Sequence, residues 1–273
     1  MSRIQNTFAA LRESGRKALI PFLTAGDPTA EFTVPCMHAM VAAGADIIEL
    51  GIPFSDPMAD GPVIQRASER ALAHKMSLRK TLALVEAFRR TDTVTPVVLM
   101  GYLNPIESLG YRTFVERARE VGVDGALTVD LPPEESGELL PLMLEAGLDP
   151  IFLLAPNSGP ERVQEMSDLG RGYLYYVSLK GVTGASNLDL DDVERRIRAI
   201  KEISSLPVGV GFGVKNAEMA GTIARFADAV VVGSALVSQI EAFQDSPDQA
   251  QAQIVDILRA MREAMDASAA RDA

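Results

Sequence analysis

The chain has few of the residues that bind metals or form disulfides. Among its 273 residues there are one cysteine, Cys36, two histidines, His38 and His74, and no tryptophan. A single cysteine excludes an internal disulfide and a cysteine metal cluster, and two histidines on predicted helices argue against a multi-histidine site. We therefore expect no metal, and acid–base chemistry carried by carboxylates, tyrosine or lysine.

Long apolar runs and excess positive charge are missing as well. No apolar stretch approaches the roughly 20 residues needed to span a bilayer. Residues 1–6 lack the apolar core of a signal peptide. The formal net charge of −11 argues against binding to nucleic-acid phosphates, which requires clustered lysine and arginine. Together with the low cysteine count, these absences predict a cytoplasmic protein that acts on neither membranes nor nucleic acids.

The composition is that of a folded protein with a large core. Hydrophobic residues make up 47% of the chain and charged residues 23%. No low-complexity linker interrupts the sequence, so we expect a single domain over residues 1–273. The tail from about residue 266 is rich in alanine and charge and is predicted to fray.

Short apolar runs alternate with amphipathic helical segments. Most of the runs are apolar throughout, as in parallel strands that are buried on both faces. With helices between them, they predict an α/β fold of the (β/α)8 TIM-barrel type, for which about 250 residues is typical. An open doubly wound sheet is the competing fold. The predicted strands are residues 18–23, 45–50, 95–100, 125–129, 149–154, 172–177, 207–211 and 228–232.

Extra helices are expected at two places. Residues 2–14 carry an apolar stripe of Ile4, Phe8 and Leu11, and Gly15 is suited to end that helix. A helix ahead of the first strand is placed to cap the amino-terminal end of a barrel. The long interval of residues 61–93 predicts two helices, with Ser77 as the cap of the second.

The most informative residue is an acid near the end of the second predicted strand. Glu49 follows an apolar run, and desolvating an unpaired carboxylate is costly or forces it to keep its proton. We interpret Glu49 as catalytic, although backbone N–H groups or a nearby cation would also satisfy a buried acid. Asp60 lies in the following Pro/Gly/Asp-rich loop and is a second catalytic candidate, although an Asp-Gly turn is the commoner use of such a residue.

Glycines after the last three predicted strands indicate an anion site. Gly184, Gly213 and Gly233 allow backbone N–H groups to approach a phosphate, and Ser234 opens a helix whose positive end points the same way. Tight turns are the alternative use of these glycines. Residues near the strand ends are candidates for an apolar pocket around a flat substrate ring: Phe22, Ile64, Met100, Leu127, Tyr175 and Phe212.

Several of these stretches resemble the alpha subunit of tryptophan synthase, and the resemblance covers nearly the whole chain. The most specific segment is ELGIPFSDP at residues 49–57, which continues as ADGPVIQ at residues 59–65. The other matching stretches are FLTAGDP at residues 22–28, MGYLNP at 100–105, GVTG at 181–184, GFG at 211–213 and GSA at 233–235. Leu103 stands where members of the family often have an aromatic residue.

The resemblance implies a lyase of tryptophan biosynthesis that cleaves indole-3-glycerol phosphate to indole and glyceraldehyde 3-phosphate without a cofactor. Glu49 corresponds to the family's general acid–base residue, and an ionised Asp60 would bind the indole N–H. Thr183 on a lid would hydrogen-bond Asp56 and close the site.

The resemblance also implies a partner. In the family a pyridoxal-phosphate-bearing beta subunit receives indole through a channel in an α2β2 heterotetramer. Pro53, Asn104 and Pro132, together with Asp56, are the candidate interface residues, because their loops lie at the end of the barrel that holds the site.

Two rival functions remain open from the residues themselves. Lys180, at the end of the sixth predicted strand, is placed for a Schiff-base aldolase acting on a sugar phosphate, although a solvated lysine is the commoner outcome. The chain could instead be a non-catalytic phosphate-ligand sensor that regulates a partner. Borohydride trapping of a substrate adduct on Lys180 would support the aldolase. Substitution of Glu49 discriminates the sensor from the acid–base mechanism, because only the latter depends on that carboxyl.

Overall fold

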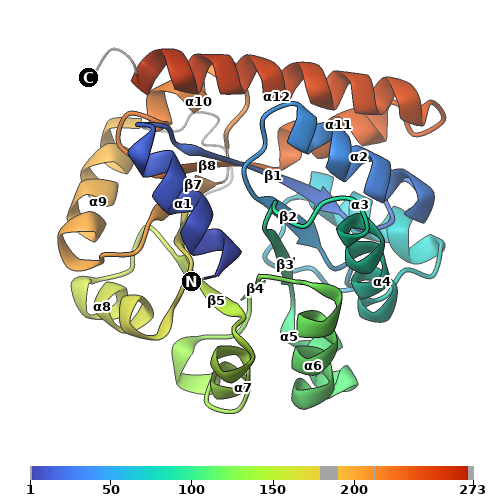
Figure 1. The fold of residues 1–273 in the computed structure, drawn as a ribbon, viewed down its shortest axis with the longest axis horizontal. Coiled ribbons are helices and arrows are strands. Elements are labelled where there is room, and N and C mark those ends of the chain that lie inside the picture. Colours follow the sequence, from blue (N-terminus) through green and yellow to red (C-terminus); the bar gives the residue numbers. More distant parts are fainter. Residues whose placement is uncertain (1, 179–189, 212, 270–273) are drawn as a thin grey trace.

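Parallel strands β1 to β8 close into a barrel, because β1 pairs with β8 as well as with β2 (Figure 1). The structure is a computed structural model that describes residues 2–178, 190–211 and 213–269. Closure confirms the predicted (β/α)8 barrel and excludes the open doubly wound sheet. The strands are β1 (Ala18–Thr24), β2 (Ile48–Gly51), β3 (Val97–Gly101), β4 (Gly125–Thr128), β5 (Asp149–Leu154), β6 (Leu174–Val177), β7 (Val208–Gly211) and β8 (Ala229–Val232).

The strands bury side chains on both faces. On β1, Ile20 and Phe22 belong to the cluster inside the barrel, whereas Leu19 and Leu23 pack outward beneath the helices. This two-sided burial explains the continuous apolar runs in the sequence. Most strands are shorter than predicted; β6, for example, begins two residues later because Gly172 has φ +74°, which is not a strand conformation.

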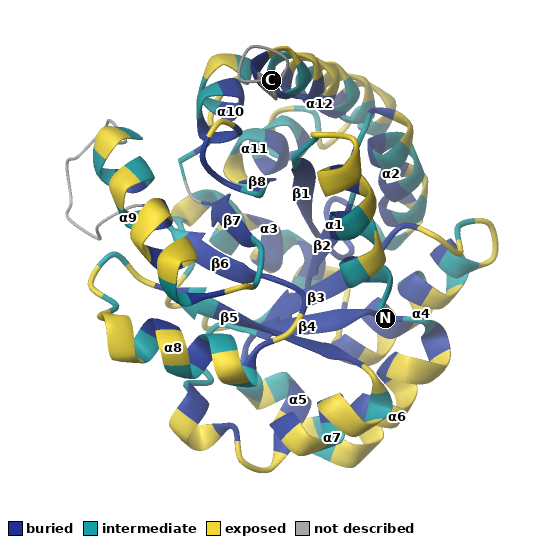
Figure 2. Cartoon of the chain, turned by 60° about the vertical axis from the view of Figure 1, so that its left-hand side comes forward, coloured by how far each residue is buried: buried dark blue, intermediate teal, exposed yellow. Residues whose placement is uncertain are grey.

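Helices surround the barrel and turn their exposed residues to the outside (Figure 2). The connection between β3 and β4 contains two helices, as does the one between β2 and β3. The helices are α1 (Arg3–Glu13), α2 (Ala30–Ala42), α3 (Pro62–Ala73), α4 (Leu78–Arg89), α5 (Leu103–Leu109), α6 (Tyr111–Val121), η1 (Pro133–Glu135), α7 (Leu139–Ala146), α8 (Pro160–Leu169), α9 (Leu190–Ile203), α10 (Ala217–Ile223), α11 (Ser234–Ala242) and α12 (Pro247–Ala269).

Helix α1 closes the amino-terminal end of the barrel, as the sequence predicts (Figure 1). Ser2 caps the helix by accepting a hydrogen bond from the backbone N–H of Gln5, and its hydroxyl donates to Asp149 at the start of β5 at 2.5 Å. Phe8 packs inside against Tyr173, with 5.9 Å between the ring centroids. The helix therefore packs against the interior side chains at this end of the barrel.

The predicted helix pair and the predicted tail have different outcomes. Helices α3 and α4 occupy the interval of residues 61–93, and Ser77 Oγ accepts a hydrogen bond from the backbone N–H of Lys80 at 3.4 Å. Helix α12 continues to Ala269, and residues 270–273 at the end of the predicted tail lie outside the described residues. Met265 and Ser268 are buried where α12 packs against α10, and this packing holds the last turns in place.

A buried ion pair joins the loop after β1 to helix α3. Arg70 donates two hydrogen bonds to the fully buried carboxylate of Asp27, at 2.7 and 2.9 Å. Arg66, one turn earlier, pairs with Glu241 of α11 in a more exposed position. Arg70 also reaches Glu241 at 3.3 Å, so these contacts connect α3 to α11.

We predict that Arg70→Met lowers the free energy of unfolding by about 3 kcal/mol, because it leaves the Asp27 carboxylate buried without its cation. Arg66→Met is the matched control on the same helix and should cost less than about 1 kcal/mol, as exposed pairs do. Urea denaturation measures both changes. Equal losses in the two variants would contradict the assignment.

Candidate active site

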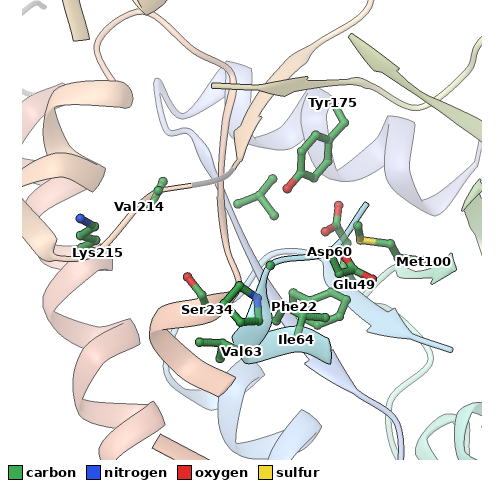
Figure 3. Close-up of a pocket in the computed structure, with 15 residues that line it drawn as sticks. Phe22, Glu49, Asp60, Val63, Ile64, Met100, Tyr175, Val214, Lys215 and Ser234 are labelled. Carbon is green, nitrogen blue, oxygen red and sulfur yellow. The ribbon is translucent and has the colours of Figure 1, made fainter. Parts of the chain in front are cut away.

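A cavity of about 320 Å³ opens at the carboxyl ends of the strands (Figure 3). It brings together residues that the sequence assigns to separate tasks: acid–base chemistry, phosphate binding and a ring pocket. In Figure 3, Glu49, Asp60 and Met100 lie close together, and Ser234 lies apart from them beside Val63. The predicted site residues on the cavity wall are Phe22, Glu49, Asp60, Ile64, Met100, Tyr175, Gly213, Gly233 and Ser234.

Strand β2 carries Glu49 into the barrel interior, where its side chain is fully buried. The Tyr173 hydroxyl donates a hydrogen bond to Glu49 Oε1 at 2.5 Å. Burial raises the pKa of Glu49 to about 7, although the hydrogen bond from Tyr173 opposes this rise. Because Oε2 has no hydrogen-bond partner among the described residues, it is the oxygen that can carry a proton to a ligand.

The loop between β2 and α3 brings Asp60 to the same cavity. Tyr102, which follows β3, donates a hydrogen bond to Asp60 Oδ2 at 3.0 Å and accepts one from the backbone N–H of Ala59 at 3.0 Å. The Tyr102 ring stacks on Phe54, with 5.1 Å between the centroids. Burial raises the pKa of Asp60 to about 6, against the effect of the Tyr102 hydrogen bond. The two carboxyl groups therefore titrate near neutrality in one cavity.

The phosphate candidates lie on the wall formed after β7 and β8. Gly213 has φ +86°, a conformation that glycine adopts without strain. Gly233 precedes α11, whose first residue is Ser234, so the positive end of this helix faces the cavity. The predicted start of a helix at this position is confirmed.

Two glycines make room for the rings of the pocket. A Cβ on Gly51 would lie 2.5 Å from the Phe22 ring, and one on Gly211 would lie 2.0 Å from the Tyr175 hydroxyl. Both rings therefore lie directly over strand backbone, and a side chain at either glycine would displace them. These contacts give the cavity an aromatic wall that suits a flat apolar ligand.

Not every predicted pocket residue reaches the wall. Leu127 packs in the same interior cluster as Phe22 and Met100, but it is not among the residues that line the cavity. The predicted residues Lys180, Thr183, Gly184 and Phe212 lie outside the described residues.

The predicted interface and lid residues differ in exposure. Asp56 is exposed and accepts a hydrogen bond from Ser55 Oγ at 2.5 Å, and Asn104 is exposed at the start of α5. Pro132 is half-buried. Pro53, in contrast, is buried within this chain, so it offers a partner little surface. Asp56 and Asn104 are thus the two predicted interface residues with the most accessible surface.

Comparison with known proteins identifies the family. The sequence model of the family described as tryptophan synthase alpha chain matches residues 8–266. The chain belongs to this family. The alpha chain of Methylococcus capsulatus (strain Bath) is 70% identical over 267 residues, which cover 98% of this chain and 100% of that protein. That of Nitrosococcus oceani is 61% identical over 268 residues, covering 98% and 99%.

Solved structures of the tryptophan synthase alpha chain family have the same fold. The alpha subunit of Legionella pneumophila str. Paris superimposes with a TM-score of 0.90 at 48% identity, covering 98% of this chain and 99% of that one. A chain of Mycobacterium tuberculosis tryptophan synthase, in its aminoacrylate-bound form, gives a TM-score of 0.86 at 35% identity, covering 97% and 100%. The fold is therefore that of the tryptophan synthase alpha chain family.

Sequence reasoning missed the two tyrosines that hold the carboxyl groups. Tyr173 lies within the predicted strand of residues 172–177, two residues before Tyr175. Residues two apart on a strand face the same side, so this alternation was an available signal. Tyr102 stands in a segment shared with the tryptophan synthase alpha chain family, but only the folded loop brings it to Asp60.

Two further properties of the described residues bear on the site. Nowhere within residues 2–178, 190–211 and 213–269 do three or more His, Cys, Asp or Glu side chains lie together so as to hold a metal ion. No helix in these same ranges is long and apolar enough to cross a membrane.

We predict that Tyr173→Phe raises the pKa of Glu49 above its value of about 7, because the variant loses the hydrogen bond that stabilises the carboxylate. Isotope-edited infrared titration of the carboxyl band measures the shift, and Glu49→Gln identifies the band. Tyr176→Phe is the control, because Tyr176 packs on the outer face of β6. An unchanged titration midpoint in Tyr173→Phe would contradict the prediction.

Proposed function

We propose that this cavity binds indole-3-glycerol phosphate and that Glu49 and Asp60 cleave it to indole and glyceraldehyde 3-phosphate. Membership of the tryptophan synthase alpha chain family makes the chain an enzyme, a carbon–carbon lyase of tryptophan biosynthesis. The observation that carries the residue assignment is the pairing of two carboxyl groups of raised pKa with the amino terminus of α11 in one cavity.

Glu49 would move both protons of the reaction. It starts protonated and gives its proton from Oε2 to C3 of the indole ring, which makes the ring an electron sink. The side-chain hydroxyl then loses its proton to the Glu49 carboxylate as the carbon–carbon bond breaks and the aldehyde forms. The glutamate ends in the state in which it began, as a general acid–base with a pKa of about 7 can.

Asp60 would stabilise the positive charge that develops on the indole nitrogen. Its ionised carboxylate accepts a hydrogen bond from the indole N–H, and this bond strengthens as C3 takes up its proton. Tyr102 fixes the carboxylate through Oδ2. Phe22, Ile64, Met100 and Tyr175 provide apolar walls for the ring, and we retain Phe212 as a further wall residue.

The phosphate group would lie at the amino terminus of α11. Gly213, Gly233 and Ser234 would supply its hydrogen-bond donors, and Gly184 would complete the set. This placement sets the phosphate apart from Glu49 within the cavity, so the bond to be broken lies between the two ends of the site.

The lid over the site and the contact with a partner subunit both belong to the carboxyl end of the barrel. We assign lid closure to a hydrogen bond between Thr183 and Asp56, which would keep water out during the reaction. An alpha chain implies a beta-subunit partner. We propose an α2β2 assembly in the cytoplasm in which indole passes to a pyridoxal-phosphate-bearing beta subunit, with Asp56, Asn104 and Pro132 at the contact. This chain itself would need no cofactor. The match to a chain of M. tuberculosis tryptophan synthase supports the partnership.

We predict that Glu49→Gln lowers kcat for indole release by about 10²- to 10⁴-fold, because an amide cannot supply the proton. Binding of indole-3-glycerol phosphate to the variant, measured by calorimetry, should change little. Glu69→Gln, at an exposed position of α3, is the control. Retained turnover in Glu49→Gln would falsify the assigned acid–base role.

We predict a bell-shaped pH profile of kcat/KM for indole release. Below about pH 6 Asp60 takes up a proton and loses its charge, so the rate falls on the acid side. Above about pH 7 Glu49 loses the proton that it must donate, so the rate falls on the alkaline side. Asp60→Asn should lower the rate and abolish the acid limb. A profile that is flat from pH 5 to 8 would contradict both assignments.

A further inference from the structure

A second, much smaller cavity lies beside Asp60. It offers about 10 Å³ to the centre of a water molecule, which is room for one water. Asp60 lines both this cavity and the larger one. The polar side chains around it come from four segments of the chain: Thr24, Asp60, Ser68 and Tyr102.

Thr24 has a hydroxyl group that needs a partner. It follows Ile20 and Phe22 on the inward face of β1, so it points into the barrel at its carboxyl end. The side chain is 1% exposed, and its Oγ1 has no hydrogen-bond partner among the described residues. Buried hydroxyl groups in native proteins are paired with protein atoms or with ordered water.

Ser68 and Asp60 complete the surroundings of this small cavity. Ser68 is buried on α3 and brings a second hydroxyl to the cavity. The Asp60 carboxylate accepts the Tyr102 hydroxyl at Oδ2, and a carboxylate has sites for further donors. A water with three polar neighbours has the number of partners that buried waters usually have.

We propose that this cavity holds one ordered water molecule that links Thr24 and Ser68 to Asp60. The Thr24 hydroxyl donates to the water, and the water donates one hydrogen to the Asp60 carboxylate and the other to Ser68 Oγ. Thr24 is then a positioning residue, because it holds the donor that stabilises the charged form of Asp60. The position of the water is inferred from the cavity and its polar side chains alone. Its expected effect on the kinetics rests on the proposed function of Asp60.

The water acts among other groups that influence the charge on Asp60. Glu49 of β2, Tyr175 of β6 and Lys215 after β7 line the larger cavity with Asp60, and Tyr102 after β3 donates to Asp60. Burial outweighs the Tyr102 hydrogen bond and leaves the pKa of Asp60 raised. A second hydrogen-bond donor to this carboxylate lowers the pKa of Asp60. The lower pKa favours the charged form that the proposed binding of the indole N–H requires.

The first test is a high-resolution crystal structure of the protein. An ordered water peak within hydrogen-bond distance of Thr24 Oγ1, Ser68 Oγ and the Asp60 carboxylate is expected. A cavity without such a peak overturns the proposal. This result is independent of the proposed function, which fails separately if Asp60→Asn retains full activity.

The second test is the acid limb of the kcat/KM profile in Thr24→Val. Loss of the hydroxyl should weaken water binding and move the acid limb up by about one pH unit, the size expected for one hydrogen bond to a charged group. Thr24→Ser keeps the hydroxyl and should restore the native profile. Thr128→Val, at the end of β4, is the control for loss of a threonine hydroxyl away from the site.

Each outcome of the second test decides the role of Thr24. An unmoved acid limb in Thr24→Val overturns that role even where the water peak is present. If Thr24→Val does not fold, Ser68→Ala removes another ligand of the water and takes its place in the measurement, with the same expected direction of shift.

Discussion

The site depends on one costly placement, the carboxyl group of Glu49 inside the barrel. A buried carboxylate with a single hydrogen bond is unstable relative to its protonated form, so the environment keeps the proton on the group near neutral pH. The fold tolerates this because Tyr173 satisfies one oxygen, whereas the other has no partner among the described residues. The same burial that costs stability thus raises the pKa of Glu49 to about 7, which suits the acid–base role that we propose for it.

The closed barrel holds this placement in position. Glu49 is fixed by its strand, and Phe22 lies beside it in register on β1. Tyr173 packs against Phe8 of α1. Helix α1 closes the opposite end of the barrel. The amino-terminal helix therefore does more than close the barrel, because it supports the tyrosine that hydrogen-bonds to the Glu49 carboxyl. Phe8, Tyr173 and Glu49 thus form a row of contacting side chains that connects the amino-terminal end of the barrel to the cavity at its carboxyl end.

Much of the fold could be predicted because its signals are local. Continuous apolar runs marked the strands, and an acid within such a run marked Glu49. Other features depend on contacts between distant segments: Tyr173 meets Glu49 across the barrel, and Pro53 is buried by neighbours that no local pattern reveals. Leu127 was expected on the cavity wall for its position near a strand end, but it is not among the residues that line the cavity. Helix α12 persists to Ala269 because packing on α10 outweighs a polar, alanine-rich composition.

The two carboxyl groups are held in physically different ways, and this difference suits the tasks that we propose for them. Glu49 belongs to a strand, and in the proposed reaction it delivers a proton to one carbon atom, which requires a fixed direction. Asp60 belongs to a loop, and in the proposed reaction it stabilises a charge that develops on the ring, which requires an ionised group more than a rigid one. Its position therefore depends on side-chain contacts, with Tyr102 at Oδ2 and Gln65 donating to its backbone carbonyl at 2.9 Å. Tyr102 also stacks on Phe54 of the loop after β2. A conformational change in that loop would therefore move the Tyr102 ring and, through its hydroxyl, the Asp60 carboxylate.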